Sequence, residues 1–160
     1  MPELSSIVAS TLASYCEEVQ RKVHDLVAPL STEQLWQRAY PYGNSIGHLL
    51  LHLTGNLNYY IGAQIAGTGY IRDRNREFTE TEKIPKAQVL ANFDRAIAMV
   101  VSTIRAQSPQ DWCAPYTSVD AVAGKDRFAV LMRMSARAYH HVGQMIYLCK
   151  ELSKVGAPEA

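Results

Sequence analysis

The chain has 160 residues, of which 48% are apolar and 19% charged, a composition typical of one globular domain with its own core. Sixteen basic residues against 15 acidic ones leave a formal net charge of +1, which gives no electrostatic reason to expect nucleic acid or an anionic membrane as a partner. No apolar run approaches the roughly 18 residues that a membrane span requires.

Three cysteines, Cys16, Cys113 and Cys149, are far apart in the chain and show no CxxC spacing. This pattern indicates reduced thiols rather than a disulfide framework or a zinc knuckle. The N-terminus shows neither a basic region nor a long apolar region, so no signal peptide is expected. We therefore expect a single cytoplasmic domain over residues 1–160.

The first half of the chain predicts two long helices. Residues 4–28 carry apolar side chains at spacings of three to five, typical of an amphipathic helix that Pro29 ends. A short helix follows, capped by Ser31 or Thr32. Asn44 or Ser45 then caps a second long helix, which is expected to continue to about residue 66, where the glycines at 67 and 69 stop it.

The second half predicts two more long helices, each preceded by an irregular segment. Residues 67–83 have no helical period, and the mixed-charge run 72–77 is expected to be a solvated loop. Pro85 is suited to the first position of a third helix that runs to about residue 107. After an irregular stretch at 110–124, a fourth helix begins near Lys125 or Asp126 and continues to about residue 154.

These segments predict an all-α fold, because no stretch alternates with period two for long enough to require a sheet. Four helices of about 22–30 residues are typical of a four-helix bundle. The long connection between the second and third helices is of a length that permits these two helices to be parallel.

Histidines mark two faces of the predicted helices. His48 and His52 are spaced i, i+4, which places both on one face of the second helix, where one metal ion can meet two imidazoles. Asn56 and Tyr59 share that face, which is small and polar where a packing face would be aliphatic.

The fourth helix carries the adjacent pair His140 and His141. His141 shares an apolar stripe with residues such as Met134 and Met145 and is expected to face the core, whereas His140 shares a polar stripe with Arg137 and Gln144. An inward histidine needs a partner for each ring nitrogen. The set is therefore consistent either with hydrogen-bonded core residues or with a metal or catalytic site.

Two segments resemble the DinB/YfiT-like superfamily. They are NSIGHLLLHLTGN at 44–56 and YHHVGQMIYL at 139–148, and the order of elements matches along nearly the whole chain. The resemblance implies a four-helix bundle of up-down-down-up topology and a divalent metal, nickel or zinc, held by three histidines. It also implies thiol-dependent S-transferase or isomerase activity, with a low-molecular-weight thiol such as bacillithiol, mycothiol or glutathione as cofactor.

The resemblance carries over to this chain only in part. His52 matches the ligand on the second helix and His141 one ligand on the fourth, but the remaining ligand position holds Arg137, and a guanidinium cannot ligate a metal. Three alternatives follow: His48 supplies the third imidazole, His140 rotates inward against the preference of its face, or the metal is lost and Arg137 places a fixed positive charge in an anion-binding pocket.

Two functional hypotheses remain open at this stage. The first is a metal-dependent enzyme of the thiol-transferase type that acts on a small electrophile, with metal ligands His52, His141 and His48 and a pocket lined by Arg137, Gln144, Tyr59 and Asn56. The second is a non-catalytic protein that binds a small molecule or dimerises and has a degenerate metal site. Under either hypothesis we expect a small-molecule ligand and a homodimer.

Overall fold

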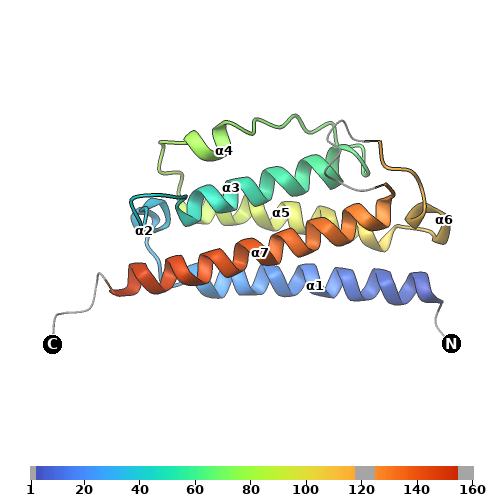
Figure 1. Cartoon of the computed structure of the whole chain (residues 1–160), viewed down its shortest axis with the longest axis horizontal. Coiled ribbons are helices and arrows are strands. Elements are labelled where there is room, and N and C mark those ends of the chain that lie inside the picture. The colour runs from blue at the N-terminus through green and yellow to red at the C-terminus, as the bar shows by residue number, and fades with distance from the viewer. Residues whose placement is uncertain (1–2, 118–124, 155–160) are drawn as a thin grey trace.

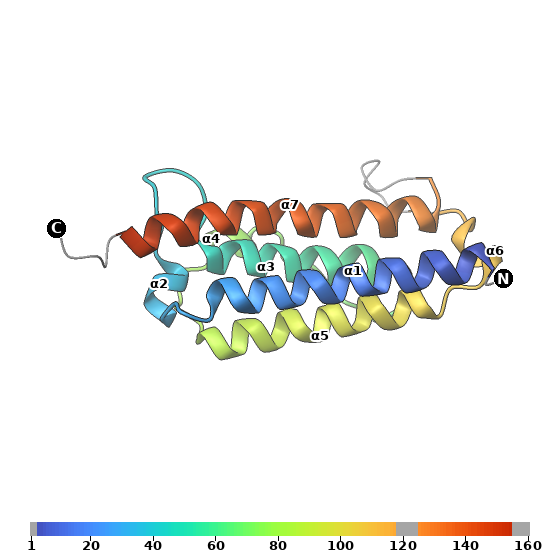
Figure 2. The same cartoon turned by 90° about the horizontal axis from the view of Figure 1, so that it is seen from below.

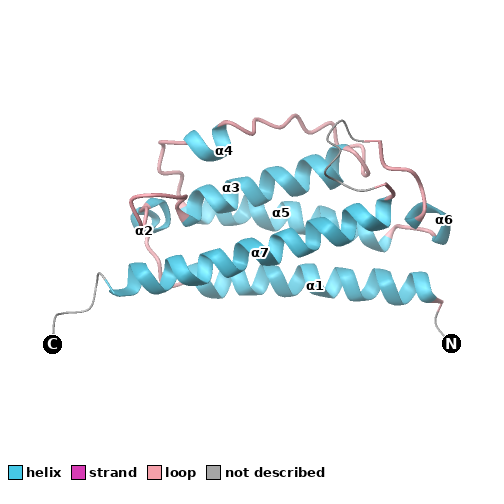
Figure 3. Ribbon diagram, in the orientation of Figure 1, coloured by secondary structure: helices cyan, strands magenta, loops and turns pink. Residues whose placement is uncertain are grey.

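Four long helices lie side by side along the long axis of the molecule (Figures 1 and 2). A computed structural model describes residues 3–117 and 125–154 of the chain. In chain order the helical elements are α1 (Leu4–Val27), α2 (Thr32–Trp36), α3 (Ile46–Leu57), the π-helical η1 (Asn58–Ala63), α4 (Arg76–Thr79), α5 (Lys86–Arg105), α6 (Pro109–Trp112) and α7 (Arg127–Lys154). Within these described ranges there is no β-strand (Figure 3), which confirms the all-α prediction.

Each of the four long helices packs against two of the others. Contacts join α1 to α5 and α7, and α3 to α5 and α7. The colour gradient in Figure 1 shows that α3 and α5 run in the same direction, whereas α1 and α7 run in the opposite one. The connection between the two parallel helices, residues 64–85, passes back along the outer side of α3, and we call it the strap (Figure 1).

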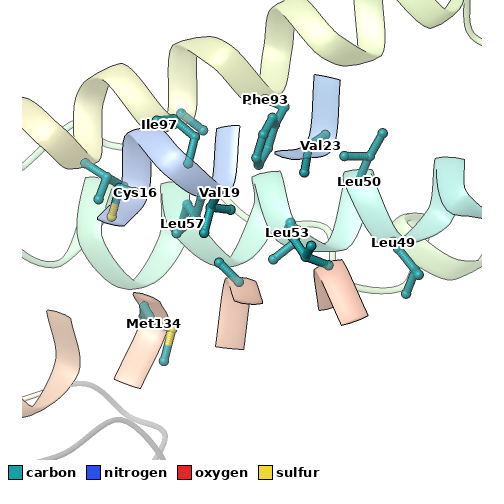
Figure 4. Packing of buried hydrophobic residues seen from close by; sticks show 14 of the residues in the cluster. Cys16, Val19, Val23, Leu49, Leu50, Leu53, Leu57, Phe93, Ile97 and Met134 are labelled. Atoms are coloured by element: carbon teal, nitrogen blue, oxygen red, sulfur yellow. The ribbon is translucent and has the colours of Figure 1, made fainter. Parts of the chain in front are cut away.

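The core lies along the common axis of the four helices, and Figure 4 shows its central part. Its fully buried members come from every long helix: Val19 and Val23 from α1, Leu50 and Leu53 from α3, Phe93 and Ile97 from α5, and Leu131 and Met145 from α7. Burying one aliphatic or aromatic side chain of this kind stabilises a fold by roughly 1.5–3 kcal/mol. The positions follow the helical period of the sequence, so the predicted apolar faces are the packed ones.

Polar side chains fix several helix ends. Ser45 caps α3 by accepting from the backbone N–H of His48, and Ser31 forms a capping box with Gln34 at α2. At the C-terminal end of α1, the Lys86 ammonium donates to the carbonyls of Val27, Ala28 and Leu30. A cation at the C-terminal carbonyls is favourable for the helix dipole, so this lysine joins the start of α5 to the end of α1.

The structure departs from the predicted elements at four places. The second predicted helix is α-helical only to Leu57 and continues as the π-helical η1. The strap contains one helical turn, α4, and the segment after α5 contains another, α6, whose cap Ser108 forms a capping box. Pro85 is the N-cap of α5 rather than its first helical residue.

Within the described residues, no helix is long and apolar enough to span a membrane.

Candidate functional site

A pocket of about 570 Å³ lies between α3, α7 and the strap. Its lining comes from four elements: His52 and Asn56 of α3, Tyr60 of η1, Arg72 and Arg74 of the strap, and Arg137, His140 and His141 of α7. Segments far apart in the sequence therefore meet at one polar cavity on the side of the helical assembly.

His52 is held on both sides of its ring. Its Nδ1 lies 2.8 Å from Oε2 of Glu77, and the Asn56 side-chain amide lies 2.9 Å from its Nε2. A carboxylate only accepts, so Nδ1–H donates to Glu77, and Nε2 accepts from Asn56. These two bonds fix one tautomer and the ring orientation, with the Nε2 lone pair at the pocket.

Glu77 is a buried carboxylate whose charge Arg72 balances. The guanidinium binds it in a bidentate manner, with Nε 2.6 Å from Oε1 and Nη2 2.7 Å from Oε2, and both side chains are buried. Burial by itself raises the pKa of Glu77, but the hydrogen bonds from Arg72 and His52 outweigh it and hold this pKa below its usual value. Glu77 is therefore ionised at neutral pH.

Gly55 makes room for that carboxylate. A Cβ placed on Gly55 would lie 2.0 Å from Oε1 of Glu77, which is far inside van der Waals contact. Glycine is therefore the only residue that fits at position 55 without moving the Glu77 carboxylate. This glycine lets α4 of the strap approach α3 closely enough for Glu77 to reach His52.

His141 lies opposite His52. The two ring centroids are 5.1 Å apart and the ring planes are nearly perpendicular, so the structure brings these two predicted residues together. Nδ1 of His141 lies 2.6 Å from Oε1 of Gln144. Burial lowers the pKa of His141, and the nearby His52, His140 and Arg137 lower it further against the opposing effect of Gln144. The imidazole is thus neutral at pH 7 and donates from Nδ1, with the lone pair on Nε2.

His48 does not join this pair. Ser45 Oγ lies 2.7 Å from its Nδ1, and the backbone carbonyl of Glu80 lies 3.0 Å from its Nε2. A carbonyl only accepts, so Nε2–H donates to Glu80 while Nδ1 accepts from the serine hydroxyl. His48 is buried against the indole of Trp36, and as placed it offers no free lone pair to the pocket.

Of the four predicted pocket residues, the structure places two in the lining. Arg137 and Asn56 line the cavity, whereas Gln144 stands behind His141 and Tyr59 is replaced in the lining by Tyr60. The α-helical period predicts Tyr59 on the face of His52. The wider turns of η1 change that period from Asn58 onward, so the next residue faces the pocket.

Positive charge dominates the pocket. Arg72 is neutralised by Glu77, but among residues 3–117 and 125–154 neither Arg74 nor Arg137 has an acidic side chain within ion-pair distance. Arg74 lies over the ring of Phe78 instead. The cavity is therefore lined by two guanidinium groups without an acidic partner, beside three imidazoles, and no carboxylate of the described residues is part of its lining.

The donors for a metal ion are fewer than the family resemblance implies. In the part of the chain that the structure describes, no three His, Cys, Asp or Glu side chains are grouped so as to hold a metal. His141 offers one Nε2 lone pair, that of His52 accepts from the Asn56 amide, and Arg137, one turn before His141, repels a cation. These described donors by themselves do not complete a three-ligand site.

Sequence reasoning missed the residues that the strap contributes. The run 72–77 was expected to be a solvated loop, but Arg72 and Glu77 are buried and only part of the run is exposed. The available signal was Gly55, a glycine one turn after His52 inside a helical pattern, which indicates a close approach by another element.

Comparison with known proteins places the chain in a family. It belongs to the family described as "Protein of unknown function (DUF1572)", which matches residues 6–156. A crystal structure of a conserved protein of locus from Enterococcus faecalis is similar, with a TM-score of 0.73 and 13% identity over 96% of this chain and 99% of that one. At this identity the likeness shows a shared fold alone. No curated protein matches the chain.

Proposed function

We propose that the chain binds a small anionic molecule in the pocket between α3, α7 and the strap. The observation that carries the proposal is the pair Arg74 and Arg137, which line the cavity with no acidic partner among the described residues. Charged groups that are not neutralised by the protein itself attract a ligand of opposite sign, and a partly enclosed cavity strengthens that attraction.

The neutral groups of the pocket suit the same ligand. The Asn56 amide has a second N–H besides the one directed at His52, and His141 becomes a donor at Nε2 when it takes up a proton. An anion placed between these groups and Arg137 would receive charge-assisted hydrogen bonds, which are about twice as strong as neutral ones. Arg137 would supply a fixed charge and His141 one that depends on pH.

The wider classification belongs to the same proposal. The direction of the four long helices supports an up-down-down-up four-helix bundle of the DinB/YfiT-like superfamily, in which Arg137 stands where the resemblance implies a metal ligand. We also propose a homodimer. Sedimentation that gives a mass near 17.8 kDa at every concentration would contradict the dimer.

A second candidate, a metal-dependent enzyme of the thiol-transferase type, is favoured by one specific observation. Both His52 and His141 donate their Nδ1–H to an oxygen acceptor, Glu77 or Gln144, and histidines that ligate metals are usually held in this way. Nickel or zinc would need a further ligand, which a low-molecular-weight thiol would supply. When bound, such a metal would lower the pKa of that thiol.

The anion proposal is tested by titrating the purified protein with sulfate. We expect Arg137→Ala to weaken sulfate binding by about tenfold, the loss of one charge-assisted contact of about 1.5 kcal/mol. Arg133→Ala is the matched control, because Arg133 is exposed on the same helix and does not line the pocket. Equal sulfate affinity in the native chain, Arg137→Ala and Arg133→Ala would overturn the proposal.

The two candidates separate in a zinc and nickel titration of the native chain and of Arg137→His. The anion proposal expects no tight metal binding by the native chain and a gain in Arg137→His, which restores an i, i+4 histidine pair with His141. Tight binding by the native chain that His52→Ala abolishes would favour the metal-dependent enzyme instead.

A further inference from the structure

A second pocket, of about 340 Å³, is lined by residues of α3, of α7 and of the loop before α3. On α7, positions 137–141 line the cationic pocket and Gln144, Tyr147 and Leu148 line the second one. On α3 the order is reversed, because the helices are antiparallel: residues 52–56 line the first pocket and Leu49 the second. The two pockets therefore follow one another along the same pair of helices.

Gln144 lies between the two pockets and contacts a residue of the first while lining the second. Its amide oxygen holds Nδ1 of His141 at the wall of the cationic pocket, while its side chain lines the second pocket. The centres of the two linings are about seven residues apart on α7, which at 1.5 Å per residue corresponds to roughly 10 Å along the helix. One small molecule of moderate length spans that distance.

The second pocket is chemically unlike the first. Tyr40 and Tyr42 stack with ring centroids 5.7 Å apart, and Tyr147, Leu148 and Leu49 belong to the same lining. No charged side chain from the described residues lines it. Tyr42 and Tyr147 are 74% and 69% exposed. Their rings therefore present a large apolar area to solvent at the edge of this pocket.

We propose that the ligand is an elongated amphipathic molecule with an anionic group at one end and an apolar, ring-sized group at the other. The anionic group lies among Arg137, His141 and Asn56, and the apolar group lies between Tyr42 and Tyr147, roughly 10 Å away. This inference rests on the proposed anion-binding function and specifies its ligand class. It excludes a free inorganic anion as the natural ligand, because such an ion would leave the tyrosine pocket empty.

Three carboxylates that share one head group test the inference: hexanoate, 6-phenylhexanoate and phenylacetate. The native chain should bind 6-phenylhexanoate at least about tenfold more tightly than hexanoate, because the phenyl ring leaves water for the tyrosine pocket. Phenylacetate should gain no such advantage, because its ring is too close to its carboxylate. NMR signals of the His141 ring report whether the head group occupies the cationic pocket.

Two variants locate the ends of the ligand. Tyr147→Ala should abolish the advantage of 6-phenylhexanoate over hexanoate, whereas Arg137→Ala should weaken all three carboxylates. Ile146→Ala is the matched control, since Ile146 is partly exposed on the same helix and lies outside both pockets. Because Tyr147 is largely exposed, its replacement leaves the core intact.

The outcomes distinguish this inference from the function on which it rests. Equal affinity for hexanoate and 6-phenylhexanoate overturns the amphipathic ligand while anion binding stands, and the absence of both carboxylate and sulfate binding overturns the proposed function itself. Binding of 6-phenylhexanoate that Arg137→Ala leaves unchanged also overturns the inference, because the head group then contributes nothing. Sedimentation that shows Tyr147→Ala turning a dimer into a monomer overturns it as well, because a second copy then covers the tyrosines.

Discussion

His48 and His52 are one turn apart on the same helix, yet they have different roles. Both rings meet the strap, and both have a hydrogen-bond partner on each nitrogen. For His48 these partners are a serine hydroxyl and a backbone carbonyl, in a buried position away from the cavity. For His52 they are a carboxylate and an amide, and the ring lines a pocket with a second histidine across from it.

The difference teaches that spacing alone does not define a site. The i, i+4 pattern places two imidazoles on one helical face, but the elements that cover that face decide which ring lines the pocket. The backbone of the strap satisfies His48, while a charged side chain of the same strap orients His52. Variants that disturb one histidine and not the other therefore test the comparison.

The largest effect is expected from Glu77→Gln, which removes the carboxylate shared by His52 and Arg72. It leaves the buried guanidinium uncompensated, so the free energy of unfolding should fall by about 3–5 kcal/mol. Urea denaturation measures this loss. Glu82→Gln, at an exposed position of the same strap, is the control and should change stability by less than about 0.5 kcal/mol. A similar small change in Glu77→Gln would show that the ion pair is not formed.

Gly55→Ala should come next, because the added methyl group meets the Glu77 carboxylate and forces α4 away from α3. We expect a loss of about 1–3 kcal/mol from overpacking, measured by thermal or urea unfolding. Gly143→Ala is the matched control: its Cβ meets nothing within 4 Å on α7, so alanine should stabilise the chain by up to about 1 kcal/mol. Stabilisation by both substitutions would contradict the close approach of the strap.

The two histidines should separate in a pair of alanine variants. His48→Ala leaves the Ser45 hydroxyl without its acceptor and the Glu80 carbonyl without its donor, and it should lower stability by about 1–3 kcal/mol, with sulfate affinity unchanged. His52→Ala should weaken sulfate binding, because it removes a wall of the pocket and the group that orients Asn56. A loss of sulfate affinity in His48→Ala that equals the loss in His52→Ala would remove the distinction.

The smallest effect is a pH dependence carried by His141. Its folded-state pKa is lowered, so as pH falls below the unfolded value of about 6.5 the unfolded chain binds the proton first and stability falls. Sulfate affinity should have the opposite pH dependence from stability. Because the anion favours protonated His141, sulfate affinity should rise as pH falls from 8 to 5. Glu77, whose folded pKa is also lowered, keeps its charge over this range, since its contribution to stability is lost only at more acidic pH.

Binding isotherms across this pH range check the effect, and His141→Gln should flatten the pH dependence of sulfate affinity. His52 and Arg137 face the same ligand, from α3 and α7 respectively, and His140 lies beside them. An unchanged pH profile in His141→Gln would show that His141 does not carry the pH dependence.

Local patterns of the sequence predicted most of the fold. The apolar period and the caps Ser31 and Ser45 placed the starts of α2 and α3, and both predictions are confirmed. The two inward stripes predicted that His52 and His141 meet. These features depend on residues within a few positions of one another, which is the range that a period or a capping motif describes.

The remaining features depend on contacts between distant segments. Glu77 is buried because Gly55, 22 positions earlier, leaves space for it, and no local pattern encodes that pairing. The exchange of Tyr59 for Tyr60 depends on the wider turns of η1, which the apolar period of the sequence does not predict. The role of His48 is likewise set by a carbonyl 32 residues away.

The strap also limits how the length of this chain can change. Residues 65–71 are mostly exposed, so an added or deleted residue there has room to be absorbed. Between Arg72 and Glu80 three contacts depend on the spacing: the Arg72–Glu77 ion pair within the strap, and two bonds to α3, from His52 to Glu77 and from His48 to the Glu80 carbonyl. A change of one residue in this interval would turn these groups away from their partners, so here the number of residues matters as much as their identity.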